Sequence, residues 1–195
     1  MKTIKPTLLA VLTAILLLLN NTDAEAQFEQ KVTLQAAGGY VEAIAPEMFK
    51  IIFHNGFSFD AGTQYNFSRT TSLLVHMKYS TFVSHVPSHP DANYNLVGIS
   101  LCPKFRFLPH AGVNPYIYGG GTFNYYRIIH ADNLIMDWKT QFGFTGGLGA
   151  DIPLTDNFAI FFQGGINGVN HPEEMLMHWY TQLGINISIF KSRTL

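Results

Sequence analysis

The 195-residue chain is poor in charge and in cysteine. Charged residues make up 13% of the sequence, about half of the ~25% typical of soluble domains. The formal net charge of -1 argues against a nucleic-acid partner, because surfaces that bind nucleic acid carry a basic patch. The single cysteine, Cys102, excludes an intrachain disulfide, and we expect it to be buried as a small apolar side chain.

The sequence also lacks an apolar run long enough for a membrane-spanning helix. Such a helix needs about 20 apolar residues, and the longest run, at 8–19, is much shorter. Two lysines precede this run, and Ala-Glu-Ala at 24–26 has the small-x-small pattern of a cleavage site. We therefore predict a cleaved signal peptide at 1–26 and one mature domain at 27–195.

Apolar and polar residues alternate with period 2 through most of the mature chain. Near the C-terminus, for example, Leu183, Ile185 and Ile187 alternate with small or polar residues. Alternation of this kind is typical of β-strands that present two different faces. The segments with this pattern are 31–41, 57–67, 73–84, 94–107, 115–127, 141–152, 158–167 and 179–189. Eight strands of about ten residues each predict an all-β fold, an eight-stranded antiparallel up-and-down transmembrane barrel.

The links between these segments alternate in length. Short turns are predicted at 68–71, 109–114 and 153–157. Longer and more polar links are predicted at 42–54, 85–93, 128–140 and 168–178. Bacterial outer-membrane barrels have short periplasmic turns and longer outer loops, so both ends of the barrel domain are expected on the short-turn side.

The composition of the polar face indicates which face points inward. A water-soluble barrel would expose the polar face, and an exposed face usually carries about 25–35% charged residues. Here the polar face is mostly Gly, Ser, Thr, Gln and Asn. We therefore expect the apolar face to contact outer-membrane lipid and the polar face to fill the barrel. Aromatic girdles are expected from Tyr40, Tyr125 and Trp179 at one end and from Phe67 and Phe107 at the other.

Five charged residues are the main charges of the polar face, and buried charges need partners. If the hairpin around Arg69 is symmetric, Asp60 lies directly across from Lys78. Asp151 is then the remaining acid that can pair with Lys104 and Arg106. The predicted interior charge network, with a structural role, consists of Asp60, Lys78, Lys104, Arg106 and Asp151. A polar path for protons or ions is the alternative, although eight-stranded barrels rarely leave a channel.

Two stretches of sequence resemble a known family. The run Asn-Pro-Tyr-Ile-Tyr-Gly-Gly-Gly at 114–121 and the hairpin at 146–160 resemble small outer-membrane β-barrel proteins of the OmpA/OmpX-like group. The resemblance implies an outer-membrane location in a Gram-negative bacterium and no cofactor. It also implies that the barrel-insertion machinery is a partner; that machinery reads an aromatic residue at the C-terminal end, near which Phe190 lies.

Histidines are concentrated in or beside the predicted outer loops. Neutral imidazoles bind zinc, copper or haem iron, so metal or haem capture is one alternative function. Ordinary polar loop residues are the simpler interpretation, because the tight spacing of zinc motifs is missing. The candidate ligands are His85, His89, His130, His171 and His178.

An enzyme that modifies lipid A is a further alternative. Ser84, His85 and the acidic residues at 173–174 supply the residue types of a lipid A deacylase. However, Ser84 and His85 are neighbours on a strand and point to opposite faces. The His-x-Ser-Asn pattern of those enzymes is also absent. We therefore expect no catalytic residues.

The remaining hypothesis is a structural or surface-binding, adhesive protein. Apolar residues at 134–136 and 175–177 are expected at the tips of outer loops. Exposed apolar residues that are contiguous often mark contact sites. The outer loops would then bind a surface ligand or protein.

Overall fold

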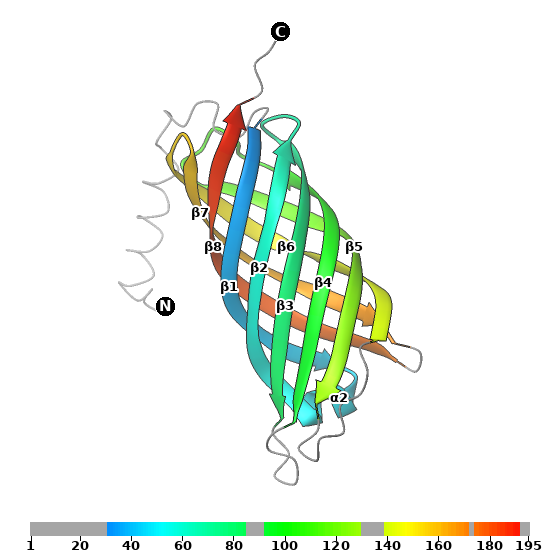
Figure 1. Ribbon diagram of the computed structural model, residues 1–195. Helices are drawn as coiled ribbons and strands as arrows, with labels where there is room; N and C mark the ends of the chain where they lie inside the picture. The colour runs from blue at the N-terminus through cyan, green and yellow to red at the C-terminus, as the bar shows by residue number, and fades with distance from the viewer. Residues whose placement is uncertain (1–30, 85–91, 130–138, 172–173, 192–195) are drawn as a thin grey trace, which may run out of the picture.

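The computed structural model describes residues 31–84, 92–129, 139–171 and 174–191. Eight antiparallel strands form a closed barrel in which each strand pairs with its neighbours in the chain (Figure 1). The predicted eight-stranded up-and-down barrel is thus confirmed, whereas the predicted signal peptide lies outside the described residues. The strands are β1 (Lys31–Ala45), β2 (Phe53–Asn66), β3 (Thr71–Ser84), β4 (Asn93–Arg106), β5 (Asn114–Ile129), β6 (Lys139–Thr155), β7 (Phe158–Asn170) and β8 (Met175–Lys191).

The strands are longer than the alternating pattern predicts. They contain 13 to 17 residues, and about ten suffice for a tilted strand to cross a bilayer. Most of the added residues come from the predicted outer links; the segment 175–177, for example, belongs to β8 and not to a loop tip. Backbone pairing continues beyond the hydrocarbon region of the membrane. Outward side chains there need not be apolar, so the alternation of apolar and polar residues ends before the strand does.

The two ends of the barrel differ. The three short connections, at 67–70, 107–113 and 156–157, lie at the end where β8 finishes (Figure 1). At the other end, the link predicted at 42–54 contains a short helix, α2 (Glu47–Ile52), and is not an open polar loop. Among the described residues, no helix has the length and apolar character needed to cross a bilayer.

The polarity of the barrel is inverted relative to a soluble protein. Phe59 is 65% exposed and its neighbour Asp60 is 3% exposed. The same contrast separates Leu148, at 63%, from Asp151, at 0%. Apolar side chains therefore form the outer surface and polar side chains the interior, as the sequence predicts.

Exposed aromatic side chains lie near both ends of the outer surface. Phe67 and Phe107 are 57% and 61% exposed beside the short turns. At the opposite end, Tyr125 is 38% exposed, and the rings of Tyr40 and Trp179 lie 5.7 Å apart. These positions agree with the two expected girdles, in which amphipathic rings lie at the membrane interfaces.

A charge placed on the middle of the outer surface tests this orientation. Ile99 is 48% exposed at the middle of β4, between Met77 and Phe123. We expect Ile99→Arg to lower the free energy of unfolding by roughly 2–4 kcal/mol, because the cation would lie in hydrocarbon. Urea unfolding in phospholipid vesicles measures this loss. Phe107→Arg, at the short-turn end, is the matched control and should cost much less; equal costs would contradict the assignment of the outer surface.

Candidate functional site in the barrel interior

Two cations share one carboxylate near the short-turn end of the barrel. Lys104 Nζ lies 2.9 Å and Arg106 Nε 3.1 Å from Asp151 Oδ2, and all three side chains are buried. Alternation brings both cations inward from β4, while Asp151 points inward from β6. Asn186 from β8 donates a further hydrogen bond to Asp151 Oδ1 at 3.0 Å. The carboxylate thus joins three strands across the interior.

The guanidinium of Arg106 extends this cluster to β2 and β3. Its Nη1 donates to Ser72 Oγ at 2.8 Å, and its Nη2 donates to Asn66 Oδ1 at 3.3 Å. The planar fork of an arginine suits such contacts, because its donors point in fixed and different directions. Lys104 Nζ also lies 3.6 Å from the centre of the Tyr116 ring. The cations are therefore held by polar and aromatic groups beyond Asp151.

Asp60 is held by a histidine that the sequence analysis did not select. Asp60 and Lys78 are direct register partners, and both are buried. The close partner of Asp60, however, is His76, whose Nδ1 lies within hydrogen-bond distance of Asp60 Oδ2 at 2.6 Å. Gln35 Nε2 donates to the other carboxylate oxygen at 3.3 Å.

The position of His76 explains why it reaches Asp60. His76 has the same inward phase as Lys78, two residues earlier on β3. It faces Gly62 on β2, where a Cβ would lie 2.6 Å from the Cβ of His76. The missing side chain at Gly62 leaves room for the imidazole to reach diagonally along the strand pair. The sequence does show that His76 and Asp60 both point inward. Their contact is missed when only directly opposite residues are considered as partners.

Lys78 is buried without a hydrogen-bond partner. Its Nζ lies 3.0 Å from the centre of the Tyr180 ring, and the side chain is 5% exposed. The Tyr180 hydroxyl is in turn within hydrogen-bond distance of Tyr118 and Thr145. The structure therefore places Lys78 against an aromatic face and not in an ion pair with Asp60.

Neutral polar side chains fill the remainder of the middle of the barrel. Tyr116 OH donates to Gln163 at 3.2 Å, Gln163 donates to Gln182 at 2.8 Å, and Gln182 donates to Ser58 at 3.0 Å. All four side chains are buried. This chain of hydrogen bonds crosses from β5 through β7 and β8 to β2, so it ties opposite walls together.

Aromatic rings close the interior at the outer end. Phe49 of α2 is 7% exposed and lies in ring contact with Phe53, Phe82 and Tyr94, with centroid distances of 5.0 to 5.8 Å. Tyr94 stacks on Tyr126 at 5.7 Å. This aromatic plug (Phe49, Phe53, Phe82, Tyr94 and Tyr126) was missed in the sequence, because residues 42–54 carry no alternation that would place Phe49 inside.

The histidine candidates are only partly described. His178 is buried at 1% exposure, with its ring 5.1 Å from that of Phe82. His171 is half-buried against the ring of Tyr126. His85, His89 and His130 lie outside the described residues. Among the residues that are described, no three His, Cys, Asp or Glu side chains are grouped so that they could hold a metal ion.

The candidate nucleophile of a lipid A enzyme is also placed. Ser84 is 7% exposed at the end of β3, where its backbone N–H donates to the carbonyl of Ala92. Its sequence neighbour His85 is outside the described residues. The arrangement adds no support to a deacylase.

These features define a class of protein. A closed antiparallel barrel with an apolar outer surface and a packed polar interior is a transmembrane β-barrel of the outer-membrane type, because only closure satisfies all backbone groups in hydrocarbon. The fold is that of the small OmpA/OmpX-like barrels, as the stretches at 114–121 and 146–160 implied.

Solved structures with the same fold support this class. Neisserial surface protein A (NspA) superimposes with a TM-score of 0.65 at 15% identity, over 81% of this chain and 97% of that protein. The N-terminal β-barrel domain of Pseudomonas aeruginosa OprF gives 0.54 at 18% identity, over 83% and 98%. Ail, the attachment invasion locus protein of Yersinia pestis, gives 0.50 at 13% identity, over 80% and 97%. No family model and no curated protein matches the sequence.

Removal of the shared carboxylate tests the cluster at the short-turn end. Asp151→Asn leaves Lys104 and Arg106 buried with no carboxylate, and we expect a loss of roughly 3–5 kcal/mol in the free energy of unfolding. Urea unfolding in detergent micelles measures it, with the exposed Glu174→Gln as control. Lys104→Met combined with Asp151→Asn should recover part of the loss. A loss below that of the control substitution would show that Asp151 is dispensable.

Proposed function

We propose that the protein is a non-enzymatic outer-membrane barrel that acts through its outer loops as an adhesive or other surface-binding protein. In this proposal the barrel is a rigid support, and the interior charge network has a structural role. The observation that carries the proposal is the filling of the interior along its length.

Three filled layers of the interior favour a supporting role for the barrel over a role in transport. The Asp151 cluster occupies the short-turn end, the Asp60–His76 pair and the Gln163–Gln182 chain occupy the middle, and the aromatic plug occupies the outer end. Eight-stranded barrels have room for side chains only. A solute that crossed the barrel would have to displace paired charges and packed rings. Any binding surface that a partner can reach therefore lies at the outer end.

The outer end offers apolar surface for a partner. Met48 and Ile51 of α2 are 67% and 58% exposed, and Ile44, before the helix, is 40% exposed. Large apolar side chains exposed in one region mark contact sites more often than isolated ones do. One protein of similar fold is by name an attachment protein, which favours adhesion among the possible surface roles.

Conductance measurements test the closed interior. We expect the purified barrel in planar bilayers to produce no stepwise current, because ion pairs and rings block the lumen at several levels. Phe49→Ala should also produce none, since the Asp60 and Asp151 layers remain. A large porin inserted under the same conditions is the positive control. Stable single-channel steps from the wild-type protein would refute a purely supporting barrel.

Adhesion measurements test the role of the outer end. Cells that display the wild-type protein are expected to bind at least one member of a panel of immobilised extracellular-matrix proteins. Binding should fall several-fold for Met48→Ser with Ile51→Ser, or when 130–138 is replaced by a Gly/Ser linker. Leu108→Ser, at the short-turn end, is the matched control because Leu108 is also exposed. Unchanged binding in both outer-end variants would contradict the proposal.

A further inference from the structure

The buried ionisable groups carry an excess of basic side chains. Among the described residues, the buried carboxylates are Asp60 and Asp151, whereas Lys78, Lys104 and Arg106 are all buried cations. When these five groups are ionised, the interior has a positive charge that no carboxylate balances. His76 and His178 can only add to this excess. Burial of an uncompensated charge is costly, so a counter-charge is expected in the interior.

Among these cations, Lys78 is the one that makes no direct contact with a carboxylate in the described part of the chain. Lys104 and Arg106 both contact Asp151, and the carboxylate of Asp60 is engaged by His76. Lys78 Nζ has no hydrogen-bond partner, and within the described part of the chain it forms no ion pair. The Tyr180 ring beneath it supplies only a weak, partial negative charge.

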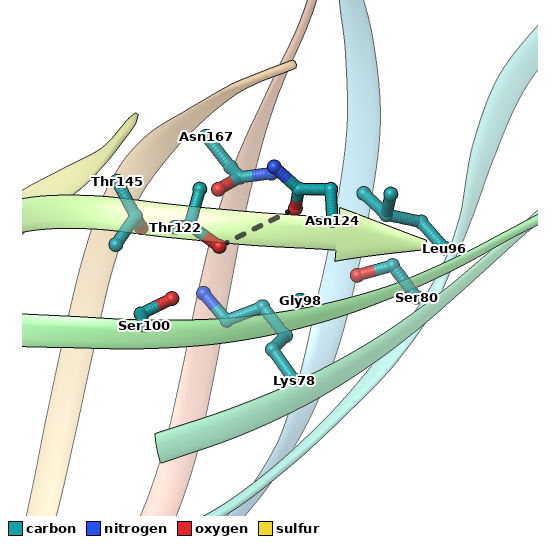
Figure 2. A pocket seen from close by; sticks show the side chains of 9 residues that line it. All are labelled: Lys78, Ser80, Leu96, Gly98, Ser100, Thr122, Asn124, Thr145 and Asn167. Atoms are coloured by element: carbon teal, nitrogen blue, oxygen red, sulfur yellow. Dashed lines mark hydrogen bonds between the residues drawn. The ribbon is translucent and has the colours of Figure 1, made fainter. Parts of the chain in front are cut away.

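A small cavity lies directly beside this ammonium group. Figure 2 shows Lys78 reaching from β3 toward side chains of β4, β5, β6 and β7. The cavity has a volume of about 10 Å³, which is room for about one water-sized species. Its lining residues are Lys78, Ser80, Leu96, Gly98, Ser100, Thr122, Asn124, Thr145 and Asn167.

The chemistry of the lining suits an anion. Two of its buried polar atoms, Lys78 Nζ and Ser80 Oγ, have no hydrogen-bond partner. The ammonium group can only donate, and a hydroxyl can rotate to donate. No carboxylate lines the cavity, so a cation would find no counter-charge there. A water molecule in this cavity would bring no negative charge to the Lys78 ammonium group.

We propose that this cavity binds one small monovalent anion of the halide class, held by Lys78 Nζ and by hydroxyl groups that line the cavity. The anion completes the interior electrostatics and fastens β3 to the strands that it faces. The site is internal and independent of any partner at the outer loops.

Bromide substitution tests the site directly. Crystals of the wild-type barrel grown in bromide are expected to give one anomalous peak within hydrogen-bond distance of Lys78 Nζ. The peak should be lost in Lys78→Met. Gly98→Ala should lose it as well while keeping the charge, because the added Cβ would lie 2.8 Å from Asn124 Oδ1 and 3.0 Å from Thr122 Oγ1 and would fill the cavity. Electron density without an anomalous signal in wild-type crystals would mean a water molecule only and would overturn the proposal.

Stability measurements provide a second readout in solution. At constant ionic strength, replacing gluconate by chloride should raise the urea midpoint of the wild-type barrel, because a ligand that binds only the folded state stabilises it. The shift should vanish in Lys78→Met and persist in Lys50→Met, whose lysine is exposed on α2. A chloride shift of equal size in wild type and Lys78→Met would contradict the site. The adhesion result has no bearing on either outcome.

Discussion

Pairing of β1 with β8 is the interaction on which the rest of this structure depends. Backbone N–H and C=O groups in hydrocarbon must bond to one another, since no water is available. The register between these two strands runs from Lys31 and Lys191 to Ala45 and Met177, and its irregularities lie near the ends, at Val32/Thr33 and Ala43/Ala45. Closure removes every edge and separates two surfaces. One surface contacts lipid, and the other encloses a small volume in which most polar groups bond to one another.

The contents of the interior change along its length as a result. At the short-turn end, Asp151 balances cations from one strand, and every group of this cluster bonds to a neighbour. At the outer end, rings contributed by α2 and by the extended strands fill space mainly through packing. The middle is intermediate, because the side chains that bond to Asp60 among the described residues are His76 and Gln35, while Lys78 rests on an aromatic ring. Polarity in the interior is therefore greatest where the connections are shortest.

Much of the fold is predictable from the sequence because a β-strand has a side-chain period of two. That period correctly predicts eight strands and the outward position of Phe59 and Ile99. A symmetric hairpin around Arg69 correctly predicts the alignment of Asp60 with Lys78. It does not predict which side chain Asp60 contacts, because long side chains also reach diagonal neighbours. It also cannot place Phe49, since a six-residue helix is too short to show its own period. The contacts of the interior depend on volume, such as the space left by Gly62, which a pattern of polarity does not encode.

The buried ion pairs of the interior bear on the register of the strands as well as on stability. Replacing a buried ion pair by apolar groups of similar size is often neutral or stabilising, so stability alone does not explain why Lys104, Arg106 and Asp151 are present. A strand of this barrel has two possible inward faces, and a slip of one residue exchanges them. If both faces were apolar, hydrocarbon would accept either. Charges on one face make the slipped register expensive, because Lys104 and Arg106 would then enter lipid. A slipped register would bring the charges of the Asp151 cluster into lipid, so this cluster adds to the cost of that register.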